Sequence, residues 1–322
     1  MTRRILVTGG FGYVGGRVAQ SLAAQPDTEV MLGSRLLRER PVWLLSGIPV
    51  VMSWNDVGQL RQACSGVDTV VHLAAMNEIE AARDPVGALE VNGVATARLM
   101  EAARAEKVGR FIYLSTAHVY GAPLAGRIDE ATCPRPVHPY ATSHRAAEDV
   151  VLAAHAAGSL AGIVVRLSNS FGAPTHPVVE RWSLLVNDLC RQVVMTGQMV
   201  LRSAGLQRRD FVTLADVGRA IAHLDGLPRE KLGDGIFNVG GAWAPSIMDM
   251  AMLVAERCDA LLGFRPSIIR PEPADGEAGY LLDYRIDKLV GSGFFLESDH
   301  EAEIDETLRL CRRAFGIDGE CK

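Results

Sequence analysis

Short apolar runs alternate with longer amphipathic segments through the first half of the chain. The apolar runs are typical of buried strands and cover residues 4–8, 29–33, 49–52, 69–73, 110–115 and 162–167. Between them, apolar residues recur at helical spacing at about 13–24, 56–64, 85–106 and 140–156. This alternation predicts an α/β fold with a doubly wound parallel sheet that helices cover on both faces.

After about residue 173 the alternation loosens into Pro-containing loops and shorter elements, including an expected helix from Arg181 to Thr196. A strand at 236–239 is expected to rejoin the sheet, and Ser246-Ile-Met-Asp249 has the pattern of a capping box that opens another helix. We expect a main domain of residues 1–172, to which about 210–245 return. A smaller C-terminal lobe of about 173–209 and 246–322 is expected to bind substrate.

The first strand runs directly into glycines at 9, 12 and 15. Glycine permits a positive φ in the turn, a close approach of the backbone to a diphosphate, and tight packing of helix against strand. The following helix presents free amides and a partial positive charge to phosphates. The position predicts a Rossmann-type dinucleotide-binding domain, although an ordinary Gly-rich turn has the same local pattern.

Composition narrows the classes of partner. With 48% hydrophobic residues in 322, the chain can bury a sizeable core, and its net charge of −5 gives no indication of nucleic acid. No apolar run is long enough to span a membrane, and residues 1–4 lead into a strand, so we expect a cytoplasmic protein. The six cysteines are scattered, without the spacing of a metal site.

Several motifs occur in one order along the chain. They are Thr8-Gly9-Gly10-Phe11-Gly12-Tyr13-Val14-Gly15, His72-Leu73-Ala74-Ala75, Asn92-Gly93, Ser115 to Gly121, Pro139-Tyr140, Arg166 to Gly172 and Arg209-Asp210-Phe211-Val212. Together they resemble the extended short-chain dehydrogenase/reductase family of nucleoside-diphosphate-sugar epimerases, dehydratases and ketoreductases. The resemblance implies a nucleotide-sugar substrate and a homodimer that forms a four-helix bundle from two helices of each subunit.

Tyr140 matches the family's acid/base tyrosine, which exchanges a proton with the sugar oxygen while a hydride moves to or from the nicotinamide. The family has a lysine four residues later, on the same helical face, and this chain has His144 there. The lysine lowers the pKa of the tyrosine, whereas a histidine is mostly neutral at pH 7 unless a partner raises its pKa. Arg145 is turned about 140° away in an ideal helix. The residues leave open whether His144 replaces the lysine fully or impairs the site.

The resemblance places further residues at the substrate. Thr116 matches the hydroxyl that donates to the substrate oxygen, and Asn169 and Arg209 match contacts to the diphosphate. Dehydratases have Asp and Glu after the threonine, and this chain has Ala117 and His118, which disfavours dehydration by that route. His118 is a candidate substrate contact, although a lone histidine after a strand is more often structural.

The end of the second strand decides between the two nicotinamide cofactors. An acid there binds the adenosine ribose of NAD, and none is present. Ser34 and Arg35, with Arg38 nearby, favour the 2′-phosphate of NADP, so NADP is the first choice and NAD the second. The full set of expected cofactor contacts is Gly9, Phe11, Gly12, Tyr13, Val14, Ser34, Arg35, Leu73, Ala74, Ala75, Asn92, Ser115, Tyr140 and His144.

Two functions of different class follow. The first is an NAD(P)-dependent epimerase or 4-ketoreductase acting on a nucleotide-linked sugar, with Thr116, Tyr140 and His144 as catalytic residues. The second is a dinucleotide-binding protein with weak or lost redox activity, serving as a sensor or partner subunit. His144 alone supports the second.

Overall fold

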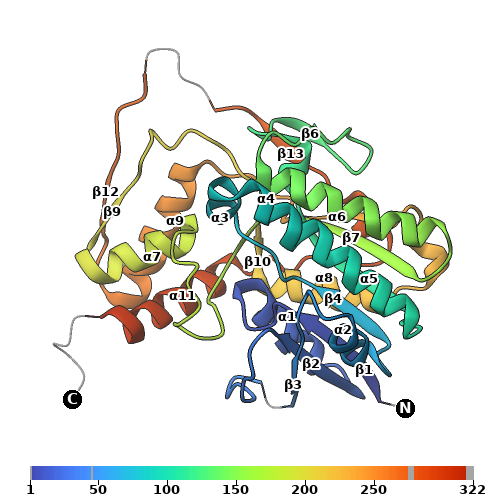
Figure 1. The fold of residues 1–322 in the computed structure, drawn as a ribbon. Helices are drawn as coiled ribbons and strands as arrows, with labels where there is room; N and C mark the ends of the chain where they lie inside the picture. Colours follow the sequence, from blue (N-terminus) through green and yellow to red (C-terminus); the bar gives the residue numbers. More distant parts are fainter. Residues whose placement is uncertain (1, 45, 275–278, 317–322) are drawn as a thin grey trace.

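A seven-stranded parallel sheet forms the centre of the larger part of the molecule (Figure 1). The computed structural model describes residues 2–44, 46–274 and 279–316. In spatial order the strands are β11 (Ile236–Val239), β7 (Ala161–Leu167), β5 (Arg110–Thr116), β4 (Thr69–His72), β1 (Arg3–Thr8), β2 (Thr28–Ser34) and β3 (Ile48–Val51). All six strands expected in the first half lie in this sheet, which confirms the predicted fold class.

Helices cover both faces of the sheet. One face packs on α1 (Tyr13–Ala23) and α8 (Leu214–Gly226), and the other on α2 (Val57–Cys64), α5 (Ala95–Ala105) and α6 (Pro139–Ala156). Because both faces are covered, the strands bury side chains on both sides, and all seven residues of β7 are buried. This explains why the strands appear in the sequence as continuous apolar runs.

The helix expected at 85–106 is helical throughout but not uniform. It follows the short α3 (Glu78–Arg83) and consists of α4 (Pro85–Ala88), a π-helical segment (Leu89–Val94) and α5. The chain reverses at Asp84, which ends α3 and caps α4 by accepting a hydrogen bond from the Gly87 amide at 2.8 Å. The π-helical segment lies against α6, beside the main cavity described below.

The C-terminal lobe has its own apolar core among α7 (Leu185–Thr196), α9 (Ile247–Leu262) and α11 (His300–Phe315), which lie together in Figure 1. The capping box at Ser246 is confirmed, with reciprocal bonds between Ser246 and Asp249. The expected start of α7 at Arg181 is wrong, because the helix begins at Leu185. Residues 181–184 form a turn in which the Asn187 amide donates to the Arg181 carbonyl and the Trp182 indole to Pro177.

In the part of the chain that the structure describes, three short parallel strand pairs lie outside the seven-stranded sheet. They are β8 (Asn169–Phe171) with β10 (Phe211–Thr213), β9 (Gln198–Val200) with β12 (Ser267–Ile269), and β6 (Gly126–Ile128) with β13 (Leu282–Tyr284). The remaining elements are α10 (Asp287–Gly291) and 3₁₀ turns at Ala117–Tyr120 and Arg229–Lys231. β11 pairs with β7, so the strand expected at 236–239 does rejoin the sheet.

The end of the expected lobe, residues 317–322, and with it Cys321, lies outside the residues that the structure describes. Within the described ranges, no helix combines the length and the apolar character that crossing a membrane requires.

Candidate active site

The glycine turn between β1 and α1 adopts a conformation that side chains would block. Gly9 has φ +71°, and a Cβ there would lie 2.8 Å from the backbone nitrogen of Ala74. A Cβ at Gly15 would lie 2.1 Å from the Gly9 carbonyl oxygen. Gly12 is the N-cap of α1, and the first turn of the helix has no acidic residue. The N-terminal end of α1 therefore offers its amides and partial positive charge to an anion without competition from its own side chains.

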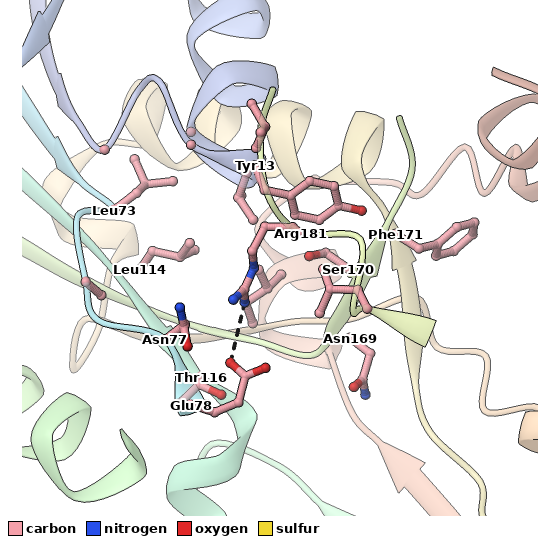
Figure 2. Close-up of a pocket in the computed structure, with 18 of the residues that line it drawn as sticks. Tyr13, Leu73, Asn77, Glu78, Leu114, Thr116, Asn169, Ser170, Phe171 and Arg181 are labelled. Atoms are coloured by element: carbon pink, nitrogen blue, oxygen red, sulfur yellow. Dashed lines mark hydrogen bonds and ion pairs between the residues drawn. The ribbon is translucent and has the colours of Figure 1, made fainter. Parts of the chain in front are cut away.

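A cavity of about 1400 Å³ runs from this turn along the carboxyl ends of the central strands to the C-terminal lobe (Figure 2). Its place follows from the strand order, because the chain leaves β1 in one direction through β2 and β3 and returns to continue on the other side with β4. Most of the expected site residues line it: Gly9, Phe11, Gly12, Tyr13, Val14, Leu73, Ala75, Ser115, Thr116, His118, Tyr140, His144, Asn169 and Arg209.

Four expected cofactor residues are not part of the cavity lining: Ser34, Arg35, Ala74 and Asn92. Asn92 is fully buried, accepts a hydrogen bond from the Met76 amide at 2.8 Å and donates to Ser143 on α6 at 2.9 Å. It thereby holds the cavity-lining backbone near Met76 against α6. The Ser34 hydroxyl accepts from the amide of Leu36 at 3.3 Å.

Arg35 is exposed at the end of β2, and it is the nearby Arg38 that reaches the cavity wall. The guanidinium of Arg38 lies 4.8 Å from the centre of the Phe11 ring, at the end of the cavity nearest the glycine turn. A cation over an aromatic ring is stabilised by the ring's negative face. This contact holds a positive charge beside the turn.

Tyr140 lies in the first turn of α6, where Pro139 and the N-cap His138 start the helix. Thr116 ends β5, and its hydroxyl accepts a hydrogen bond from the His118 amide at 3.2 Å. Burial raises the pKa of Tyr140 to about 12, and the carboxylate of Glu78 raises it further, while Arg181 and the nearby Thr116 hydroxyl lower it. The structure therefore brings together the two expected hydroxyl groups but keeps Tyr140 protonated at neutral pH.

His144 is buried one helical turn beyond Tyr140, and its ring packs edge-on against the Tyr140 ring with centroids 4.5 Å apart. Burial lowers the pKa of His144 to about 3, and the neighbouring His72 and His118 lower it further. His144 is therefore neutral at physiological pH. Among the described residues, no partner restores to position 144 the positive charge of a lysine.

Tyr113 fixes which nitrogen of His144 bears the hydrogen. The Tyr113 hydroxyl lies 2.7 Å from Nδ1 of His144, and Nε2 has no partner in the described part of the chain. If the Tyr113 hydroxyl donates to Nδ1, only the Nε2–H of His144 is left without a hydrogen-bond partner. If Nδ1–H donated to Tyr113 instead, both the hydroxyl hydrogen of Tyr113 and Nε2 would be left without a partner. Tyr113 therefore donates to Nδ1, and His144 presents a buried Nε2–H donor in the cavity wall.

A buried ion pair lies behind the site. Glu148 and Arg166 are 0% and 1% exposed and are joined by two hydrogen bonds of 3.0 and 2.8 Å. Ser115 donates to the same carboxylate at 2.6 Å, which orients the strand end next to Thr116. Arg145 bonds to Glu148 and to Asp149, carboxylates of its own helix, consistent with its expected direction away from Tyr140.

Asn169 and Arg209 approach each other because β8 and β10 pair side by side. The Asn169 amide donates to the Asp210 carbonyl at 3.0 Å, and the Arg209 guanidinium donates to Gln207 at 3.2 Å. Both residues line the cavity, and burial lowers the pKa of Arg209. His118 also lines the cavity, and its pKa is lowered by burial and by Arg209, so it is neutral.

Two cavity residues had no sequence signal. Arg181, in the turn before α7, extends across the cavity toward Glu78, the first residue of α3, and their side chains form an ion pair at 3.4 Å (Figure 2). In the sequence Glu78 is one of several acids near a helix start, and Arg181 belongs to an expected helix. Only the tertiary fold brings these two segments together beside Thr116.

Comparisons with known proteins agree with this geometry. The model of the NAD dependent epimerase/dehydratase family matches residues 5–240. The dTDP-glucose 4,6-dehydratase of Streptomyces niveus is 28% identical over 80% of this chain and 78% of its own length. The GDP-6-deoxy-D-mannose reductase of Pseudomonas aeruginosa is 29% identical over 80% of each chain. The structure of Thermus thermophilus UDP-glucose 4-epimerase with NAD is 26% identical, with a TM-score of 0.77, over 97% of this chain and 99% of that chain.

Proposed function

Because the chain belongs to the NAD-dependent epimerase/dehydratase family, we propose that it is an epimerase or 4-ketoreductase that acts on a nucleotide-linked sugar. The observation that carries the proposal is that Thr116 and Tyr140 lie together in the wall of the cavity that begins at the glycine turn. The expected lobe, about 173–209 and 246–322, contributes Arg181 and Arg209 to the same cavity and would hold the sugar nucleotide.

The residues present fit a nicotinamide dinucleotide. The turn at Gly9 to Gly15 leaves room for a diphosphate, and the unpartnered Nε2–H of His144 suits a ribose hydroxyl. The cofactor, when bound, supplies or accepts the hydride. The exposed Arg35 and the cavity-lining Arg38, with no acid at the end of β2, favour NADP over NAD. Weaker binding of NADP, but not of NAD, to an Arg38→Gln variant would support this preference.

Thr116 and Tyr140 would share the proton chemistry. The Thr116 hydroxyl donates to the substrate oxygen as negative charge develops on it, and Tyr140 gives a proton to that oxygen or takes one from it. His144 acts by position: its Nε2–H holds a ribose hydroxyl while Tyr113 keeps the ring in that orientation. Asn169 and Arg209 would bind the diphosphate of the substrate.

Epimerisation or reduction fits the site better than dehydration. The relative from Streptomyces niveus is a dTDP-glucose 4,6-dehydratase. Elimination of water in such enzymes uses the two acids that follow the threonine, and this chain has Ala117, which is 2% exposed, and the neutral His118. Neither side chain can take the place of a carboxyl pair.

One observation favours the second candidate function, a dinucleotide-binding protein with feeble redox activity. The depressed pKa of His144 leaves Tyr140 without the adjacent cation that would lower its own pKa. Such a protein would bind NADP or NAD through the same glycine turn and would turn over no sugar nucleotide.

Incubation of the protein and of Tyr140→Phe with each cofactor and a panel of uridine-, thymidine- and guanosine-diphosphate sugars separates the two functions. We expect a 4-epimer or a reduced sugar nucleotide from the parent and none from the variant, with equal cofactor affinity. Cofactor binding without product from either protein would favour the binding function. Equal turnover by both would remove Tyr140 from the chemistry.

We also propose that the protein is a homodimer joined through α5 and α6, two helices that pack side by side on one face of the sheet. Exposed apolar side chains in the adjoining helical segment, Val86, Leu89 and Val94, support this face as the interface. Sedimentation of a Leu89→Glu variant as a monomer, against a dimeric parent, would bear the interface out.

A further inference from the structure

Tyr140 is surrounded by groups of both signs from several elements, but its own helix offers it no free cation. The ionisable side chains near it are His138, His144 and Glu148 on α6, His72 and Tyr113 on the strands beneath, His118 and Arg209 at the substrate end, and Glu78 and Arg181 across the cavity. His144 is neutral, and Glu148 is bound by Arg166. The charges that act on the hydroxyl are those of Glu78 and Arg181.

Glu78 and Arg181 line the same cavity as Tyr140. Their ion pair at 3.4 Å joins α3, which packs against α6, to the turn before α7 in the other lobe. Figure 2 shows the Arg181 side chain reaching across the cavity to Glu78 beside Thr116. The Glu78 side chain is 44% exposed and that of Arg181 27% exposed, so neither is locked in the core.

The two charges act on Tyr140 with opposite sign. Glu78 raises the pKa of Tyr140 and Arg181 lowers it, beside the larger effect of burial. Glu78 also raises the pKa of His118, which lines the same cavity. A ligand can take the place of one side chain in a partly exposed ion pair of this kind, because such an ion pair contributes little to stability.

We propose that the Glu78–Arg181 ion pair controls the acidity of the Tyr140 hydroxyl from across the cavity, in the place of a lysine at position 144. A sugar hydroxyl that binds Glu78 draws the carboxylate away from the guanidinium and leaves Arg181 facing Tyr140. The phenolate is then favoured when substrate is in place. The catalytic meaning of this inference rests on the proposed function, whereas the effect on acidity does not.

The test is an ultraviolet titration of Tyr140 in the protein without ligands. Tyrosinate absorbance after a rapid alkaline pH jump is recorded for the parent, and the signal of Tyr140→Phe is subtracted to isolate Tyr140. We expect Glu78→Gln to lower the pKa of Tyr140 by about 1 unit and Arg181→Gln to raise it by a similar amount. Arg181→Lys, which keeps the charge, should leave it close to the parent value, and the double variant Glu78→Gln/Arg181→Gln should fall between the single variants.

Arg104→Gln is the matched control, since Arg104 is also partly exposed, is paired with Glu101 at 2.8 Å and does not line the cavity. It should not move the pKa of Tyr140. Shifts of the same sign in Glu78→Gln and Arg181→Gln, or no shift in either folded variant, would overturn the inference. If the glutamine variants unfold at alkaline pH, Glu78→Asp and Arg181→Lys are compared by the pH dependence of turnover, where Arg181→Lys must keep the parent profile.

Failure of the inference and failure of the proposed function are distinguishable. Opposite shifts without turnover of any sugar nucleotide would leave the electrostatic control in place and remove the enzymatic role. Turnover that Tyr140→Phe abolishes, with no shift in either charge variant, would retain the enzyme and remove the control by Glu78 and Arg181.

Discussion

Two carboxylate–arginine pairs lie near the site of Thr116 and Tyr140, and they differ in almost every physical respect. Glu148 and Arg166 are buried, held by two hydrogen bonds and joined by Ser115. Glu78 and Arg181 meet through one longer contact at 3.4 Å and remain partly exposed. In the buried pair the two charges neutralise each other and are held in place. This pair therefore stabilises the end of β5. The open pair is free to change partners, so it is the one that can respond to substrate.

The largest effect is expected from a change at Tyr140. Tyr140→Phe removes the proton donor and acceptor, and turnover should fall by about 10²- to 10⁴-fold. Cofactor affinity, measured by fluorescence titration, should stay at the parent value because the glycine turn is untouched. A large loss of cofactor binding would mean that Tyr140 acts chiefly by holding the cofactor.

The two pairs should differ in what they contribute to stability. Glu148→Ala leaves the fully buried Arg166 without its partner and should lower the free energy of unfolding by about 3–5 kcal/mol. Glu78→Ala is its matched control and should change that free energy by less than about 1 kcal/mol, because the pair is partly solvated. Denaturant unfolding of the three proteins measures both, and equal losses would contradict the contrast.

The neutral histidine on the buried side should make the protein sensitive to acid. The pKa of His144 is about 3 in the folded state and near 6.5 when unfolded, so below pH 6.5 the unfolded chain gains a proton that the folded one does not. The free energy of unfolding should therefore fall as pH falls through this range, by about 1.4 kcal/mol per pH unit for this residue. His72 behaves in the same way, with a pKa of about 3. His144→Gln should show a shallower slope than the parent, and identical slopes would argue that His144 is protonated in the fold.

Much of the molecule could be predicted from local pattern. Strands buried on both faces give continuous apolar runs. Close backbone contacts leave no space for a side chain at Gly9 and Gly15, and a Cβ at Gly12 would lie only 3.1 Å from the Gly9 carbonyl oxygen. The helical spacing of apolar residues predicts the helix at 85–106. It does not predict the π-helical segment at Leu89–Val94, because a single wider turn hardly changes the spacing of apolar residues. The expected start of α7 at Arg181 is too early. No helix-breaking residue marks the turn at 181–184 in the sequence, because hydrogen bonds of Trp182 and Asn187 hold it.

The electrostatics of the site could not be predicted in this way. The charge of His144 depends on its burial and on Tyr113, which lies 31 residues away in the sequence. Glu78 and Arg181 are separated by 103 residues and belong to no motif. The family resemblance predicted the hydroxyl groups of Thr116 and Tyr140 in one site, whereas the charges that act on them come from elements that only the tertiary fold brings together.

The most direct measurement is the pH dependence of single-turnover hydride transfer from a nucleotide sugar, followed by nicotinamide absorbance in the parent and in Tyr140→Phe. With a neutral His144 and Tyr140 as the base, the parent rate should rise with pH through the range around 6.5 and above, since the phenolate fraction grows toward the pKa of about 12. The Tyr140→Phe rate should be low and flat. A parent rate that falls as pH rises through about 6.5 would show that a protonated histidine is required, and would contradict the account.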